Sequence, residues 1–319
     1  MFFKAAIALG AGLASALLFF IPVKGTTAAM MLAFFGPLPI MIAGLGFGTI
    51  SSVAATLAGA AALAVGLTPA FALFFVLTLG LPAALLSHLA ARLRVVTLAE
   101  SAETISIPAY SKGQMLAWVT VLSAMIALVP LSVMMMRGMD FDETALQLAP
   151  AIRTFFKGEA NIPYGLSARE FARMAVIAFP AMFAASSTLM LAFNLWLAAK
   201  VARASALMDQ GESDLPFELR LPRDCIWVLL AAVAACTLGE MPRAIASTLA
   251  ASFLTAYALH GLAVVHGFLR GNPVRAALLF GLYALITLTA WPLLLAAAVG
   301  MFDSLIPVTR RRAPPPATA

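Results

Sequence analysis

Two histidines stand in one long apolar stretch and are the first side chains to consider as chemical groups. His260 and His266 are six positions apart, which places them about 120° apart around a helix. They therefore cannot bind one metal ion from a single helix face. Two interpretations of His260 stay open: a hydrogen bond between two helices, or a contact to a ligand or a proton in a cavity.

Two prolines and one asparagine complete the predicted site. Pro37 and Pro39 stand in the apolar segment 36–39, where they free backbone carbonyls that must find other partners or line a cavity. Asn194 is a polar side chain in another apolar stretch, and such a side chain bonds a neighbouring helix or a ligand. We therefore predict a ligand-binding site that includes Pro37, Pro39, Asn194 and His260. The alternative is that the prolines kink a packed helix and the two polar side chains only join helices.

The acidic residues and the missing motifs limit the chemistry. All 14 carboxylates fall in expected loops or at helix ends, whereas ion-coupled carriers commonly keep a carboxylate inside the membrane. The sequence contains no phosphate-binding Gly-rich loop, no His-Glu-x-x-His zinc motif and no Gly-x-Ser-x-Gly elbow. We therefore expect no enzyme activity, no ATPase within the chain, no metal site and no cofactor.

Composition decides the class of protein that must position these residues. Hydrophobic residues make up 63% of the 319 residues and charged residues only 11%, far below the roughly 25% of soluble domains. The net charge of +6 is spread along the expected loops, which is typical of loops that face a cytoplasm and anionic lipids rather than nucleic acid. We expect an all-α, polytopic transmembrane helix bundle with eight or nine spans, membrane lipids as partners and no nucleic-acid partner.

The spans lie between the charged residues, within one transmembrane domain over 1–302. They are expected near 5–22, 27–47, 51–66, 69–89, 115–136, 174–199, 226–238, 244–268 and 276–302. The stretch 226–238 is shorter than the ~20 residues that a span needs, so the count falls to eight if it does not cross. The basic, Pro-rich tail 303–319 is expected to be disordered.

The long loop after the fifth span carries an amphipathic pattern. Leu148, Ile152, Phe155 and Phe156 share one helical face within residues 144–157. Such a pattern predicts a short helix that lies in the membrane interface.

Two further patterns concern the sixth span and the orientation of the chain. Ser167 and Glu170 are spaced as a capping box, which predicts that the sixth span begins there. Trp196 stands near the end of that span, where an aromatic side chain lines a pocket or anchors at the interface. When the long acidic loop is discounted, the Lys and Arg residues favour the side that holds Lys4 as cytoplasmic, so we expect the N-terminus inside.

Three segments carry a resemblance to a known family. They are GPLPIMIAGLGFG (residues 36–48), HGLAVVHG (residues 260–267) and GMFDSLIPVTRRR (residues 300–312), and they resemble the YybS-like family of uncharacterised bacterial integral membrane proteins. That family is similar in helix pattern to the substrate-binding membrane subunits of energy-coupling-factor transporters and to the rod-shape protein MreD. The resemblance implies a bacterial cytoplasmic (inner) membrane and an early helix face of small residues turned to a partner. Two faces of this kind fit: Ala6, Gly10 and Ala14, or Ala8, Gly12 and Ala16.

Two functions follow from these observations. The first is a transport-type protein that binds a small solute between the second span and the sixth or eighth, and that relies on a partner protein for energy. The second is a non-enzymatic membrane scaffold or regulator of cell-envelope machinery, which binds a protein partner through the interfacial helix or the loop 200–224.

Overall fold

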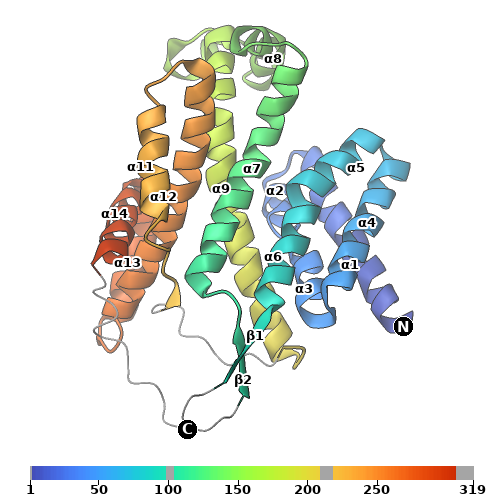
Figure 1. Ribbon diagram of the computed structural model, residues 1–319. Helices are drawn as coiled ribbons and strands as arrows, with labels where there is room; N and C mark the ends of the chain where they lie inside the picture. Colours follow the sequence, from blue (N-terminus) through green and yellow to red (C-terminus); the bar gives the residue numbers. More distant parts are fainter. Residues whose placement is uncertain (1, 98–103, 209–217, 307–319) are drawn as a thin grey trace.

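The fold is almost entirely helical, as Figure 1 shows, and the all-α prediction is confirmed. The computed structural model describes residues 2–97, 104–208 and 218–306. Within this part of the chain, strands β1 (Leu93–Thr97) and β2 (Thr104–Pro108) form one antiparallel hairpin. The sequence analysis did not predict this hairpin, although its runs of β-branched residues favour strands.

The helices follow the apolar stretches of the sequence. In chain order they are α1 (Phe2–Phe20), α2 (Thr27–Ala33), α3 (Leu38–Phe47), α4 (Thr49–Gly66), α5 (Pro69–Phe75), α6 (Leu81–Ala91), α7 (Lys112–Met136), α8 (Phe141–Phe155), α9 (Ala168–Ala204), α11 (Cys225–Ala235), α12 (Glu240–Phe268), α13 (Arg275–Thr289) and α14 (Trp291–Leu305). Figure 1 shows α1 to α6 on one side and α11 to α14 on the other. The long helix α9 contacts α3 and α6 as well as α7, α8 and α12, so it joins the two sides.

Seven segments of the described chain are long and apolar enough to cross a membrane. They are Phe2–Val23, Thr27–Phe47, Thr49–Gly66, Pro69–Ala91, Lys112–Met136, Ala168–Ala204 and Glu240–Phe268. The pair α13 and α14 adds an eighth if its two helices, bent by 119° at Ala290, count as one broken span. The described chain therefore reaches the lower of the two predicted counts. The segment predicted at 226–238 is only the 11-residue helix α11, which is too short for a full span.

In the sequence, helix α11 follows α9 and precedes α12, and in the bundle it lies alongside α12 (Figure 1). The non-helical segment 219–224 precedes α11. Leu221 and Cys225 are buried there, against Leu116 of α7 and Tyr257 of α12. Irregular backbone at membrane depth must be covered by protein or line a watery cavity. In this segment Leu221 is buried, and residues 220–223 line a polar cavity.

Small residues allow the closest helix contacts. A Cβ atom on Gly12 of α1 would lie 2.2 Å from the carbonyl oxygen of Ala55 on α4, so the two backbones touch there. Such contacts are how lipid-embedded helices gain packing energy. The contact with α4 buries the small face of α1 that contains Ala8, Gly12 and Ala16. The other small face of α1 (Ala6, Gly10 and Ala14) is exposed.

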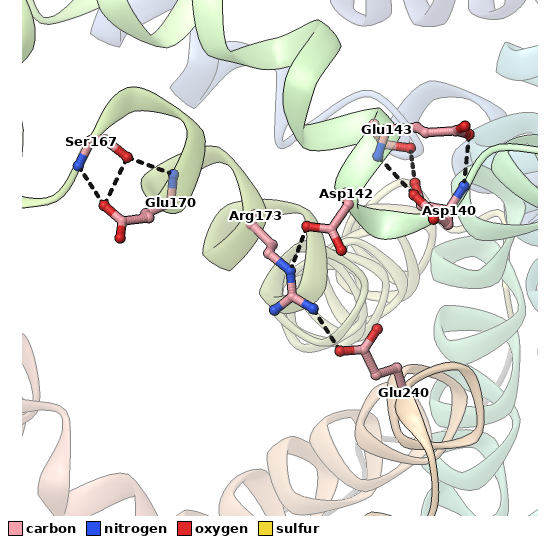
Figure 2. Close-up of polar contacts among 8 residues, drawn as sticks. Asp140, Asp142, Glu143, Ser167, Glu170, Arg173 and Glu240 are labelled. Atoms are coloured by element: carbon pink, nitrogen blue, oxygen red, sulfur yellow. Dashed lines mark hydrogen bonds and ion pairs between the residues drawn. The ribbon is translucent and has the colours of Figure 1, made fainter.

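Polar contacts fix α8 across one end of the bundle (Figure 2). Arg173 of α9 donates from Nε to Asp142 of α8 at 3.0 Å and from a terminal nitrogen to Glu240 of α12 at 2.6 Å. A second capping box, Asp140 with Glu143, begins α8. The predicted box of Ser167 and Glu170 is confirmed at the start of α9.

The predicted interfacial helix 144–157 corresponds to α8, but only part of its apolar face is buried. Ile152 and Phe156 pack against a small core that includes Ala149 and Ile162. Phe155 is 78% exposed. The tail predicted at 303–319 begins later than expected, because residues 303–305 form the last turn of α14. Residues 307–319 lie outside the described part of the chain.

Candidate functional site

Asn194 lies against the proline break that the sequence analysis singled out. The break separates α2 from α3, and Asn194 donates one hydrogen bond of 2.7 Å from Nδ2 to the carbonyl oxygen of Phe34. Ser15 of α1 donates a second, of 2.6 Å, to the carbonyl oxygen of Gly36. Pro37 and Pro39 cannot donate to the carbonyls of Ala33 and Phe35, which accept from Gly36 and Leu38 instead, so Asn194 and Ser15 bond the two other carbonyls of the break. The arrangement matches the alternative, left open by the sequence, in which side chains of neighbouring helices donate hydrogen bonds to carbonyls of the break.

His260 belongs to a buried ionic cluster where α12, α14 and the segment before α11 meet. Its Nε2 atom lies 3.2 Å from Oδ2 of Asp303, and Nε of Arg220 lies 3.4 Å from the same oxygen. The Arg220 guanidinium also donates to the backbone carbonyl of Asp303. The Ser304 hydroxyl lies 3.4 Å from Nδ1 of His260. Two basic side chains, Arg220 and His260, therefore share the Asp303 carboxylate inside the helix bundle.

Asp303 is the functional candidate that the sequence analysis missed. The prediction placed every carboxylate in a loop or at a helix end, and Asp303 is indeed at the end of α14. That end is buried, however, and the Asp303 side chain is only 2% exposed. The pattern of charges along the chain could not show this, because α14 turns back against the middle of α12. Buried ionisable groups in membrane proteins are uncommon and usually have a partner or a function.

An apolar cavity lies between α7 and α9, beside the hairpin. It has a volume of about 460 Å³. Its lining residues are Phe34, Ala90, Pro108, Tyr110, Lys112, Met115, Leu116, Val119, Leu189, Ala192, Phe193, Leu195, Trp196, Ala199, Arg203, Met208, Leu219 and Leu259. Trp196 lines this cavity and is also 38% exposed, so both interpretations of this side chain stay predictions. Volumes of this size, with mostly apolar walls and a few polar groups, are typical of small-molecule sites.

A second, polar cavity lies on the other side of the first turn of α7. It has a volume of about 590 Å³ and is lined by Ser111, Gln114, Arg220, Leu221, Pro222, Arg223 and Ser304. Arg220 and Ser304 connect this cavity to the ionic cluster.

One thin wall separates the two cavities. It consists of residues 111–116 of the α7 start and the extended residues 219–222, which contribute side chains to both cavities. The two segments touch at Gly113, where a Cβ atom would lie 1.5 Å from the carbonyl oxygen of Arg220. Because that neighbour is backbone, it cannot turn aside as a flexible side chain would. Gly113 therefore keeps the two segments in direct contact.

The four predicted site residues are not brought together around one cavity. Asn194 and the break at Pro37 and Pro39 form one contact, and His260 belongs to the ionic cluster. Their neighbours Phe193 and Leu259 line the apolar cavity instead. The sequence analysis missed Lys112 and Arg203, which it counted only as loop charges. Lys112 stands at the start of the fifth span and Arg203 at the end of the sixth. This could have indicated that both side chains lie at the same end of the bundle.

The fold and its cavities define a polytopic helical membrane protein with a buried ionic cluster and one large apolar cavity. The chain belongs to the family described as predicted membrane protein DUF2232, whose model matches residues 13–304. No curated protein and no solved structure gives a significant match to the chain. The similarity to the YybS-like family and to energy-coupling-factor subunits is not shown by these comparisons and stays a prediction.

Proposed function

We propose that this membrane protein binds a small solute as part of a transport process, without an ATPase or catalytic centre of its own. The apolar cavity between α7 and α9 is the observation that carries the proposal. Leu189, Phe193 and Trp196 in its wall are 39%, 39% and 38% exposed, so the cavity opens at the surface of the bundle and a molecule can enter it from there. A cavity of about 460 Å³ with a few polar groups at its wall is large enough for a drug-sized molecule.

The proposal includes a protein partner that supplies the energy. Ala6, Gly10 and Ala14 give α1 an exposed face of small residues, and a Cβ atom on Gly10 would meet nothing within 4 Å. Helices in lipid associate closely through such faces, so this face supports α1 as the contact to a partner. We also propose a bacterial inner membrane with the N-terminus on the cytoplasmic side, on the basis of the Lys and Arg pattern.

Native mass spectrometry of protein extracted gently from its own membrane tests solute binding. We expect a reproducible small-molecule adduct on the wild type and its loss in Ala192→Phe, because the phenyl ring would fill part of the cavity. The matched control is Ala231→Phe, which makes the same change at an exposed position of α11. This control should keep the adduct.

Two results would contradict solute binding. One is a wild-type spectrum that carries only bulk lipids in their membrane proportions. The other is an adduct that survives in Ala192→Phe as it does in Ala231→Phe, since the cavity would then not hold it.

A scaffold role is the second candidate, and α8 is the observation that favours it. Phe155 is 78% exposed and Leu146 is 58% exposed on this surface helix. Exposed apolar side chains at the end of a bundle are typical of a protein or membrane contact. If α8 binds a partner, we expect Phe155→Ser to abolish co-purification of that partner while the native-mass-spectrometry adduct is unchanged. Unaltered co-purification from Phe155→Ser cells would remove α8 as the contact.

A further inference from the structure

We infer that the solute of the apolar cavity is an anionic amphiphile, with one carboxylate or phosphate head group and a hydrocarbon chain. The inference rests on the proposed function and names its substrate class. It follows from the charges at the cavity, the length of its apolar part and the position of both within the bundle.

The charges come first. Among the described residues that line the cavity, both charged side chains are cationic: Lys112 and Arg203. They lie close enough for their positive charges to act on each other. Among the described residues, Glu218 is the acidic residue that acts on Lys112, so this end of the cavity has two described cations and one described carboxylate. Two cations held together beside an apolar space are unfavourable unless an anion joins them.

The two cations stand at one end of an elongated apolar space. Arg203 is near the last turn of α9, and the lining residue Leu189 is fourteen positions earlier, about 21 Å away along the helix. Lys112 is the first residue of α7, and the lining residue Val119 is seven positions later, about 10 Å along that helix. Between the charged end and the far end, the cavity is lined mostly by Leu, Ala, Met and Phe side chains. Polarity therefore changes along the cavity from a charged end to an apolar end.

The positions of the charged end and the apolar end of the cavity within the bundle also fit an amphiphile. The charged end lies where α7 begins and α9 ends, beside the hairpin (Figure 1). The apolar end extends into the helix bundle towards Phe34 and Phe193, which pack against each other at 6.1 Å between ring centroids. A small polar anion would leave these apolar walls unfilled, and a neutral hydrocarbon would leave one more cation than carboxylate among the described residues at the charged end. An anionic amphiphile matches both ends.

Trp196 lines the cavity and gives a direct optical test. Trp196 is also 38% exposed, so its quenching by probe in the surrounding lipid is measured separately in the Ala192→Phe background and subtracted. The other three tryptophans, Trp118, Trp227 and Trp291, are replaced by phenylalanine, so that Trp196 alone fluoresces. The protein is placed in phosphatidylcholine nanodiscs. Three brominated probes with the same chain are then titrated: 9,10-dibromostearate, 9,10-dibromooctadecyl phosphate and 9,10-dibromooctadecanol. Bromine quenches tryptophan only at close range, so quenching measures entry into the cavity beyond the level given by surrounding lipid.

We expect the anionic probes to quench Trp196 at about tenfold lower mole fraction than the alcohol, which is the difference made by one charged hydrogen bond. Lys112→Gln with Arg203→Gln should remove this difference, and Lys112→Arg with Arg203→Lys should keep it. The matched control is Arg137→Gln with Lys157→Gln, which removes two cations at the other end of the bundle and should change nothing. Stronger quenching by the carboxylate or by the phosphate probe identifies the head group, and either result supports the inference.

The outcomes separate the two proposals. If the alcohol quenches as well as the anions, and the Lys112 and Arg203 variants do not alter this, the anionic class is wrong while solute binding stands. If Ala192→Phe in the same background leaves all quenching unchanged, the probes do not enter the cavity. Solute binding at this site would then fail together with the class.

Discussion

Gly261→Val is expected to detach α14 from α12 and to lower the stability of the protein more than any other single change discussed here. A Cβ atom at position 261 would lie 1.7 Å from the carbonyl oxygen of Ala296 and 2.6 Å from its carbonyl carbon. Because these atoms are backbone, the helices must separate. Overpacking commonly costs about 1–3 kcal/mol, and we expect about 3 kcal/mol or more here. The thermal midpoint of the purified protein in detergent measures the loss.

Gly281→Val is the matched control for this change. Gly281 lies in the helix α13, and a Cβ atom there would meet nothing within 4 Å. It therefore makes the same change of helix propensity without a clash. Equal midpoints for the two variants would mean that α12 and α14 do not touch at Gly261 in the membrane protein.

Asp303→Ala is expected to have the second largest effect, because it leaves Arg220 and His260 without their shared carboxylate. Removing one partner of a buried ion pair costs about 3–5 kcal/mol. The Arg220 side chain is 25% exposed and can turn towards the polar cavity, so we expect the low end of this range. Denaturant midpoints of Asp303→Ala and the wild type, measured by the circular dichroism of the helices, check the prediction.

A double variant tests whether the loss comes from unpaired charge. Replacing the ion pair by apolar side chains of similar size, Asp303→Leu with Arg220→Met, should recover much of the stability lost in Asp303→Ala. As a control, Asp142→Asn breaks an ion pair whose carboxylate side chain is 50% exposed. Exposed pairs contribute little, so its midpoint should stay close to that of the wild type. An unchanged midpoint for Asp303→Ala would show that the cluster does not hold α14 in place.

Much of the fold could be predicted from the sequence because lipid imposes a simple rule. Every spanning helix needs an apolar run of sufficient length, so the stretches between charges located α1, α7, α9 and α12. The capping box at Ser167 set the start of α9, because its two hydrogen bonds are local. The same rule failed for 226–238, where only the 11-residue helix α11 forms and the non-helical residues 219–224 precede it.

The candidate site could be predicted only in part, because it depends on contacts between distant segments. Asn194 and Phe34 are 160 positions apart, so the spacing of residues could not show that one satisfies the carbonyl of the other. Asp303 and His260 meet because α14 turns back on α12, and the bend of 119° that causes this has no charge pattern. The apolar cavity is a space between packed side chains. A sequence indicates which side chains are apolar, but not where they leave a gap.

The unequal lengths of the spanning segments have a consequence for the surrounding lipid. The first four segments have 18 to 23 residues, or about 27–35 Å of helix, close to the ~30 Å thickness of the hydrocarbon layer. Helices α7, α9 and α12 have 25, 37 and 29 residues, or about 37–55 Å. A bilayer adapts to such a mismatch by thickening, by thinning or by tilting the helix. The lipid beside α1 and α4 therefore meets shorter helices than the lipid beside α12, and we expect the hydrocarbon layer to be thinner on the side of α1 and α4.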